Sequence, residues 1–436
     1  MKITFIGATN EVTGSKTYFE YEQEKILIDC GLYQEGESNS QLNFDLLPFK
    51  PSELTAVIIT HAHLDHTGFL PVLYKQGYRG PIYMTLPTAK LARIILEDSA
   101  KLMAETDKPL YDVEDSQKVI SLFKPQIFEE PIKHNSLSFK FHKASHILGA
   151  SFVEVHTGLK TITFSGDLGR FDDILLGSPA KLNKTNYLIM ESTYGDKVRP
   201  HSDMIKELSE LISKAKSENK TILIPCFALH RAQLISYLIS KIFIDSPELE
   251  IPLFLNSPMM EQVTFAYKKF LHEFNDSETN LGLAWNNLNF LDHYWDIEKV
   301  NNYQMPQIII ASSGMVTGGR IWSHLLSLSK RNDVILFLPG FQAPGTPGHD
   351  LINGKRNIIS PTGEEVLVQC EIIYSGSFSS HGDQSDLINW IQSAHQQPDK
   401  IFLVHGEPDS KKVLADKLCS MEYNTIIPKH LQTFEL

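Results

Sequence analysis

The segment Thr60-His61-Ala62-His63-Leu64-Asp65-His66 places four potential metal ligands within six positions. It follows an apolar run over Ala56–Thr60 that predicts a strand, so we expect the segment to form a loop at the strand's end. Extended backbone would send the side chains of His61 and His63 to the same side, and Asp65 and His66 follow as the chain turns. Imidazole and carboxylate suit a zinc-like ion. The spacing therefore predicts two neighbouring metal sites, against the plainer alternative of a histidine-rich surface loop.

Three more candidate ligands, His146, Asp167 and His405, end apolar strands or lie in turns. Asp167 stands between Gly166 and Gly169, which let the backbone approach closely. Each of the three alone would more often be structural, as part of a capped turn or as a satisfied core histidine. Together with the histidine-rich segment they complete two sets of ligands: His61, His63 and His146 for one ion, Asp65, His66 and His405 for the other, and Asp167 as a bridge.

Two metal sites side by side have a chemical purpose. Two ions about 3.5–4 Å apart can bind a bridging hydroxide and stabilise both the attacking and the leaving oxygen of a phosphodiester. A metal-bound water has its pKa lowered to about 7, which supplies a nucleophile at neutral pH. Zinc is inferred from the ligand types, and manganese or iron could occupy the same sites. The ligand pattern thus predicts a hydrolase that uses a hydroxide activated by two metals.

Three further polar residues could support this chemistry, each with a plainer alternative. Asp29 ends a predicted buried strand and could orient a ligand histidine, although a turn-initiating Asp before Gly31 is an equally good interpretation. His381 lies in a polar turn and could be a general acid, or could simply belong to a helix-capping turn. Glu191 stands at a strand end and could pair with a histidine, whereas residue type alone favours a solvated carboxylate.

The chain that must position these residues has 436 residues, of which 42% are apolar and 21% charged, as in an ordinary globular protein. This length predicts about two to three domains. The formal net charge of −12 argues against a broad basic footprint for nucleic acid, so any such contact must be local. The four cysteines form no CxxC pair, and no apolar run approaches the ~18 residues of a membrane helix. We therefore expect a cytoplasmic protein without membrane association.

The pattern of elements changes twice along the chain. Short β-rich runs with turn signals fill the first part. The middle part alternates helices with runs such as Gln307–Ala311 and Val334–Pro339, whose apolar character is typical of strands in a parallel sheet. The last part returns to short units. We predict an α/β domain inserted into an α+β domain, with boundaries near Tyr194 and Val368, so that residues 1–194 and 369–436 form the outer domain and residues 195–368 the insertion.

The ligand pattern resembles a known superfamily. Asp29, the histidine-rich segment, His146, Asp167 and His405 resemble the metallo-β-lactamase superfamily in order and context, and the long gap before His405 has room for a whole domain. Glu191, His381 and His405 resemble the three additional motifs of the β-CASP subfamily, whose nucleases act on RNA and DNA. Four further stretches are similar to that subfamily: Glu11-Val12-Thr13-Gly14-Ser15, Glu191-Ser192-Thr193-Tyr194-Gly195, Pro225-Cys226-Phe227-Ala228 with Arg231-Ala232-Gln233, and Ser312-Ser313-Gly314-Met315. The pattern most resembles prokaryotic relatives of the nuclease subunit that cuts eukaryotic pre-mRNA at its 3′ end.

The resemblance implies a metallo-β-lactamase αββα sandwich with an inserted α/β β-CASP domain, and a two-zinc phosphodiesterase acting on single-stranded RNA. It assigns the metal ligands as two sets: His61, His63, His146 and Asp167 for one zinc, and Asp65, His66, Asp167 and His405 for the other. The catalytic residues would be Asp65 and His381, with Glu191 supporting His381 as the acid for the leaving group. Asp29 would orient a ligand. Arg231 and the turn Ser312-Ser313-Gly314 would line the cleft facing the phosphates.

Several choices stay open in the sequence. Cleavage could be endonucleolytic, 5′-exonucleolytic or both, in RNA processing or decay. The alternatives are a two-zinc hydrolase of a small phosphodiester or (thio)ester, against which the inserted domain argues, and a non-catalytic RNA-binding subunit, against which the intact ligands argue. Whether the chain forms a homo-oligomer is undecided. Where Pro347 and His349 stand, the family more often has Leu and Arg, and the loss of that positive charge could weaken RNA binding or change its polarity preference.

Overall fold

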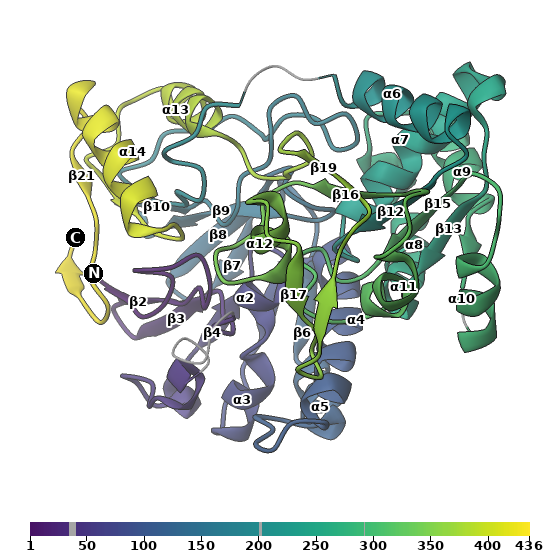
Figure 1. Ribbon diagram of the computed structural model, residues 1–436. Coiled ribbons are helices and arrows are strands. Elements are labelled where there is room, and N and C mark those ends of the chain that lie inside the picture. The colour runs from purple at the N-terminus through teal and green to yellow at the C-terminus, as the bar shows by residue number, and fades with distance from the viewer. Residues whose placement is uncertain (35–40, 200–202, 292) are drawn as a thin grey trace. The chain divides into compact units, whose positions relative to one another are not determined.

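The structure is a computed structural model and describes residues 1–34, 41–199, 203–291 and 293–436 (Figure 1). The chain divides into two compact units. The first unit is formed by Met1–Val198 together with Ser380–Leu436, and the second by Arg199–Ser379. In the described part of the chain, every helix is too short or too polar to cross a membrane.

Two seven-stranded sheets form the centre of the first unit. In spatial order, the first sheet contains β22 (Thr433–Glu435), β1 (Lys2–Phe5), β2 (Thr17–Tyr21), β3 (Glu24–Ile28), β4 (Ala56–Ile58), β5 (Ile82–Thr85) and β6 (Phe123–Gln126). The second contains β21 (Thr425–Ile426), β20 (Lys400–Leu403), β11 (Tyr187–Met190), β10 (Thr161–Phe164), β9 (Ser151–His156), β8 (Leu137–Lys143) and β7 (Ile132–His134). Because β1 pairs with β22, the two ends of the chain lie side by side (Figure 1).

One apolar core joins the inner faces of these two sheets. Phe5 and Ile28 contribute to it from the first sheet, and Phe141 and Val153 from the second. Helices cover the outer faces: α3 (Leu70–Lys75), α4 (Leu86–Met103) and α5 (Val113–Ile120) on the side of the first sheet, and α13 (Gln384–Gln392) and α14 (Pro408–Ser420) on the side of the second. This αββα order confirms the predicted sandwich.

The second unit is built on a six-stranded sheet that is parallel throughout. Its strands in spatial order are β14 (Asn289–Phe290), β13 (Leu253–Asn256), β15 (Gln307–Ala311), β12 (Thr221–Pro225), β16 (Val334–Pro339) and β19 (Glu371–Ser375). Its helices are α6 (Met204–Ser217), α7 (Arg231–Asp245), α8 (Pro258–Tyr267), α9 (Glu278–Asn286), α10 (Tyr294–Asn301), α11 (Ile321–Leu328) and α12 (Pro347–Ile352), and β17 (Asn357–Ile359) pairs with β18 (Glu365–Leu367) in a hairpin. Every residue of β12, β15 and β16 is buried, which explains their apolar sequences.

The boundaries between the two units differ from those we predicted from the sequence. The divisions fall after Val198 and after Ser379, whereas we placed boundaries near Tyr194 and Val368. The second difference has a structural cause. We assigned the strand around Ile372 to the outer domain, but β19 pairs with β16 and completes the sheet of the second unit. A short strand carries little sequence information about which sheet it joins.

Candidate metal centre

The histidine-rich segment leaves the carboxyl end of β4 and enters the one-turn helix α2 (Leu64–Thr67). Backbone bonds hold this turn against the segment after β3, because the Cys30 N–H donates to the His66 carbonyl oxygen at 2.8 Å. The two segments approach so closely that a Cβ atom at Gly31 would lie 1.5 Å from the Asp65 carbonyl oxygen. Gly31 is therefore required by this packing.

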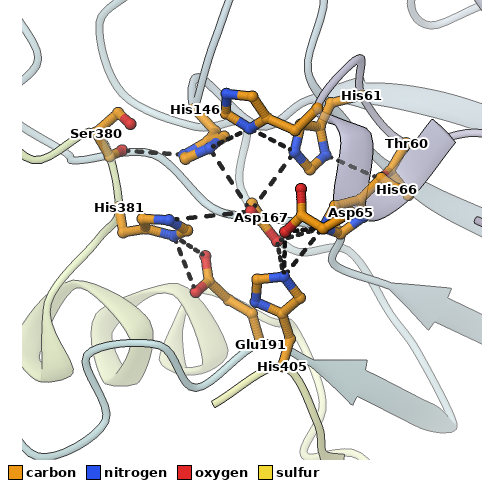
Figure 2. A network of polar contacts seen from close by, with 12 residues as sticks. Thr60, His61, Asp65, His66, His146, Asp167, Glu191, Ser380, His381 and His405 are labelled. Carbon is orange, nitrogen blue, oxygen red and sulfur yellow. Dashed lines mark hydrogen bonds and ion pairs between the residues drawn. The ribbon is translucent and has the colours of Figure 1, made fainter. Parts of the chain in front are cut away.

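Four of the predicted ligands converge in a first cluster: His61, His63, His146 and Asp167. One nitrogen or oxygen atom from each residue lies within 4.8 Å of the others. His61 Nε2 is 3.0 Å from His63 Nδ1, and His146 Nε2 is 3.3 Å from that same His63 nitrogen. The imidazole nitrogens thus point at one another (Figure 2).

The remaining three ligands form a second cluster: Asp65, His66 and His405. His66 Nε2 is 3.1 Å from His405 Nε2, and His405 Nε2 is 3.3 Å from Asp65 Oδ2. Asp29 fixes the orientation of His66, because its Oδ2 lies 2.8 Å from His66 Nδ1. That contact places the Nδ1 proton towards Asp29 and directs Nε2 into the cluster.

Asp167 lies between the two clusters and turns one carboxylate oxygen towards each (Figure 2). Its Oδ2 is 3.5 Å from His61 Nε2 and 3.6 Å from His146 Nε2. Its Oδ1 is 3.3 Å from His66 Nε2 and 3.5 Å from His405 Nε2. Asp167 Oδ1 is fully buried and has no hydrogen-bond partner among the residues that the structure describes.

This arrangement fits a metal better than it fits a hydrogen-bonded network. Buried polar atoms are normally satisfied by hydrogen bonds, and an orphaned buried carboxylate oxygen is costly on its own. A cation placed between these donors would satisfy them together. The imidazole and carboxylate donors are those of zinc-type sites. We conclude that these residues can hold metal.

Burial and charge set the protonation of the cluster. Burial lowers the pKa of His61 well below its ordinary value and lowers the pKa of His63 to about 4. Burial alone would also lower the pKa of His66, but the carboxylates of Asp167 and Asp29 raise it well above its ordinary value. His61 and His63 are therefore neutral at physiological pH, which is the form that binds a metal.

His381 lies beside the first cluster but contributes no atom to it. Its Nδ1 is 3.3 Å from Glu191 Oε2, and its Nε2 is 4.0 Å from Asp167 Oδ2 (Figure 2). Glu191 is buried rather than solvated, and its Oε1 also accepts the Leu168 N–H at 2.5 Å. The Glu191 carboxylate therefore links His381 to the segment that carries Asp167.

Two residues near the centre were missed by sequence reasoning. The Thr193 hydroxyl lies 3.1 Å from His405 Nδ1, and the Thr60 hydroxyl contacts Asp29 at 2.9 Å and 3.0 Å. Both stand next to a predicted functional residue, in Glu191-Ser192-Thr193 and in Thr60-His61. That adjacency is the only signal that could have indicated them.

The predicted phosphate-facing residues lie in the second unit. Ser312, Ser313 and Gly314 follow β15, and Arg231 opens α7 and donates from Nη1 to the Pro339 carbonyl oxygen at 3.1 Å. Pro347 and His349 lie in the first turn of α12. Phe227, which sequence reasoning did not single out by itself, lies between Arg231 and Gly314.

Fold and centre together define a metallo-hydrolase of the αββα type, and comparison with known proteins agrees. The metallo-beta-lactamase superfamily matches residues 11–225, the Beta-Casp domain matches residues 232–351, and the Zn-dependent metallo-hydrolase RNA specificity domain matches residues 365–428. The chain belongs to the β-CASP subfamily of the metallo-β-lactamase superfamily, which confirms the resemblance seen in its motifs and makes it a metal-dependent hydrolase.

Particular relatives sharpen this placement. The chain is 34% identical over 426 residues to ribonuclease TTHA0252 of Thermus thermophilus, covering 95% of each chain. It is 28% identical over 459 residues to the transcription termination factor FttA of Methanocaldococcus jannaschii, covering 100% of this chain and 72% of the relative. A solved protein of unknown function from Enterococcus faecalis V583 shares the fold, with a TM-score of 0.59 at 14% identity over 100% of this chain and 99% of the other.

Proposed function

We propose that this chain is a zinc-dependent ribonuclease that hydrolyses phosphodiester bonds of single-stranded RNA, as an endonuclease, a 5′-exonuclease or both. The observation that carries the proposal is the placement of Asp167 between two ligand clusters, with one carboxylate oxygen directed to each. The RNA substrate is supported by the match to an RNA specificity domain and by the ribonuclease among the relatives.

In this proposal the seven ligands hold two zinc ions, divided as the clusters divide. One ion would be held by His61, His63, His146 and Asp167, and the other by Asp65, His66 and His405 with Asp167 as a shared residue. Bound there, the ions supply Lewis-acid stabilisation of the phosphoryl oxygens and lower the pKa of the attacking water. Asp65 is the more exposed of the two cluster carboxylates, with 16% of its side chain accessible against 2% for Asp167. It is therefore the carboxylate able to orient that water by accepting its hydrogen bond.

His381 provides the acid for the leaving oxygen. Its Nδ1 contacts the Glu191 carboxylate, which orients the ring, and its Nε2 faces the space beside Asp167. The His381 side chain is 20% exposed, so a substrate oxygen can reach it. Donation from Nε2 would neutralise the alkoxide that forms when the P–O bond breaks.

The test is cleavage of a single-stranded RNA labelled at either end. Zinc-loaded protein is compared with the double variant Asp65→Ala, His66→Ala, and metal content is measured for both. His156→Ala is the matched control, because it removes a partly exposed imidazole outside both clusters. We expect cleavage by the parent and by the control, and neither cleavage nor full metal content in the double variant.

The products of this assay decide the mode of cleavage. A ladder that shortens only from the 5′ end indicates an exonuclease, whereas internal fragments indicate an endonuclease. If the parent protein binds two metals and leaves RNA intact, the ribonuclease proposal fails. A small phosphodiester or ester substrate, or a requirement for a partner subunit, would then explain the centre.

A further inference from the structure

The carboxyl edge of the parallel sheet in the second unit is a natural place for a ligand. β12 and β15 are neighbours, but the chain leaves them in opposite directions. After β12 it passes β15 to reach β13, and after β15 it passes β12 to reach β16. Open parallel sheets bind ligands outside the carboxyl ends of the strands at such a reversal of strand order. The segments after Pro225 and after Ala311 border this point.

Phe227 stands at this edge, two residues beyond β12. It remains 37% exposed although it is a large apolar side chain. The guanidinium carbon of Arg231 lies 4.9 Å from the centre of its ring, a cation–π distance. The Arg231 guanidinium is itself anchored by its bond to the Pro339 carbonyl oxygen at the end of β16. The ring therefore follows the end of β12, and the cation beside it is tied to the end of β16.

Two glycines make room for this pair. A Cβ atom at Gly314 would lie 2.9 Å from the Phe227 ring, so only glycine lets the turn after β15 pack against it. Gly340 has a φ of +89°, and a Cβ atom there would lie 3.1 Å from the Arg231 guanidinium carbon. Both close approaches serve the same ring and cation, which indicates a built surface rather than an incidental exposed side chain.

We propose that the Phe227 ring is a stacking platform for a nucleobase of the single-stranded RNA substrate, with Arg231 supporting the ring and attracting the backbone. This inference rests on the proposed ribonuclease function. Stacking on an aromatic ring is tolerant of sequence, because every base has a π face. It also suits a chain with a net charge of −12, which cannot rely on a broad basic surface to hold RNA.

The chain offers a matched control in Phe265. This side chain is 50% exposed, and the Lys268 ammonium lies 5.3 Å from the centre of its ring, so it too is an exposed ring with a cation over it. It belongs to α8 and lies next to Phe290 of the edge strand β14, with ring centres 6.4 Å apart. It is therefore outside the reversal of strand order that defines the proposed platform.

The test combines protein variants with RNA that lacks a single base. We expect Phe227→Ala to raise KM for single-stranded RNA roughly 5- to 150-fold, the range for the loss of one stacked base, with kcat unchanged. Phe227→Tyr should restore the parental KM, and Phe265→Ala should leave it unchanged. A series of RNAs with an abasic nucleotide at successive positions should include one position at which binding to the parent is weakened by a similar factor. At that position the missing base should not weaken binding to Phe227→Ala.

A parental KM in Phe227→Ala would overturn the platform, and so would equal sensitivity of both proteins to the abasic nucleotide. Failure of the ribonuclease proposal is read separately. If zinc-loaded parent protein does not cleave RNA, 2-aminopurine placed in the RNA still reports stacking by fluorescence quenching. Quenching by the parent and by Phe265→Ala, but not by Phe227→Ala, supports the platform without any cleavage. Equal quenching by all three proteins, or none, overturns it.

Discussion

Buried histidines occur in both units, and they have different partners. In the first unit, the ring nitrogens of His66 and His405 face each other at 3.1 Å. In the second unit, His324 is equally buried, but its Nδ1 lies 2.6 Å from Asn301 Oδ1 and its Nε2 lies 2.9 Å from Asn256 Nδ2. Each ring nitrogen of His324 therefore has a neutral amide partner of its own.

The difference shows that the partners of a buried histidine indicate its role, whereas burial alone does not. His324 meets donors and acceptors that satisfy a neutral ring, so it needs no ion. His66 and His405 direct ring nitrogens at one another and at carboxylates, an arrangement that a cation between them would satisfy. Among the described residues, just the two clusters around Asp167 bring three or more such groups together.

Among the tests of this difference between histidines, removal of the His381 side chain should have the largest effect on cleavage. Like His66, His381 has one nitrogen on a carboxylate, but its other nitrogen lies beside the first cluster and belongs to neither cluster. We expect His381→Ala to lower kcat for RNA cleavage about 10²- to 10⁴-fold, the usual contribution of a general acid, with the zinc content unchanged. Steady-state kinetics and metal analysis on the same sample check this.

Glu191→Gln refines the test of His381. The amide keeps the size of the side chain and part of its contact with His381 Nδ1 but removes the carboxylate, so kcat should fall by less than in His381→Ala. Unimpaired cleavage by His381→Ala would end the proposed acid role. Loss of zinc from that variant would place His381 among the ligands instead.

Lowering the pH should show the contribution of His324, the hydrogen-bonded histidine of the second unit, to stability. Burial, followed by the nearby Arg320, lowers the pKa of His324 to about 4 from an ordinary value of 6.5. Between these two values the unfolded chain binds a proton at this residue and the folded chain does not. The contribution of His324 to the free energy of unfolding is therefore complete above pH 6.5 and falls as the pH is lowered towards 4, by roughly 3 kcal/mol in total.

Urea unfolding at pH 7 and at pH 4.5 measures this contribution. His324→Gln removes the titrating group, and all other acid-sensitive groups are common to both proteins. We expect the difference in stability between parent and variant to shift in favour of the variant as the pH falls. A difference that does not change with pH would show that His324 has an ordinary pKa.

The sequence indicated the site better than it indicated the limits of the domains. All seven candidate ligands were predicted as two sets with Asp167 shared, and the structure brings them together as two groups with Asp167 in the first, because ligand chemistry shows in residue type and in position after a strand. The αββα sandwich followed from the family resemblance. The sheet to which β19 belongs did not follow from the sequence, because its pairing with β16 joins segments that are distant in sequence.

Contacts made through the backbone were also beyond sequence reasoning. The bond from the Leu168 N–H satisfies the buried Glu191 carboxylate, yet a backbone donor leaves no trace in residue type. The pairing of Phe227 with Arg231 depends on Gly314 and Gly340, which stand at the ends of two other strands. Such features appear only when the strands are placed side by side.

Asp29→Asn should have the smallest effect and tests the contrast most directly. It would give His66 an amide partner of the kind that His324 has, while the other contacts of the site stay in place. Asp29 has a φ of +58°, a conformation that Asn adopts readily, so the exchange removes the charge without straining the backbone. The Asp29 carboxylate lies 2.8 Å from His66 Nδ1 and accepts the Thr60 N–H at 2.8 Å.

We expect zinc affinity to fall about 10- to 100-fold in Asp29→Asn, as for other partners that orient a ligand histidine. The physical reason is that a carboxylate makes the opposite nitrogen of His66 more basic and fixes its direction, whereas an amide can turn its NH₂ group towards Nδ1 and thereby favour the other tautomer. Competition with a zinc chelator measures the affinity, and His324→Gln, which alters a histidine without metal contacts, serves as the control. An unchanged affinity would mean that the partner of a buried histidine matters less to metal binding than the convergence of the ring nitrogens.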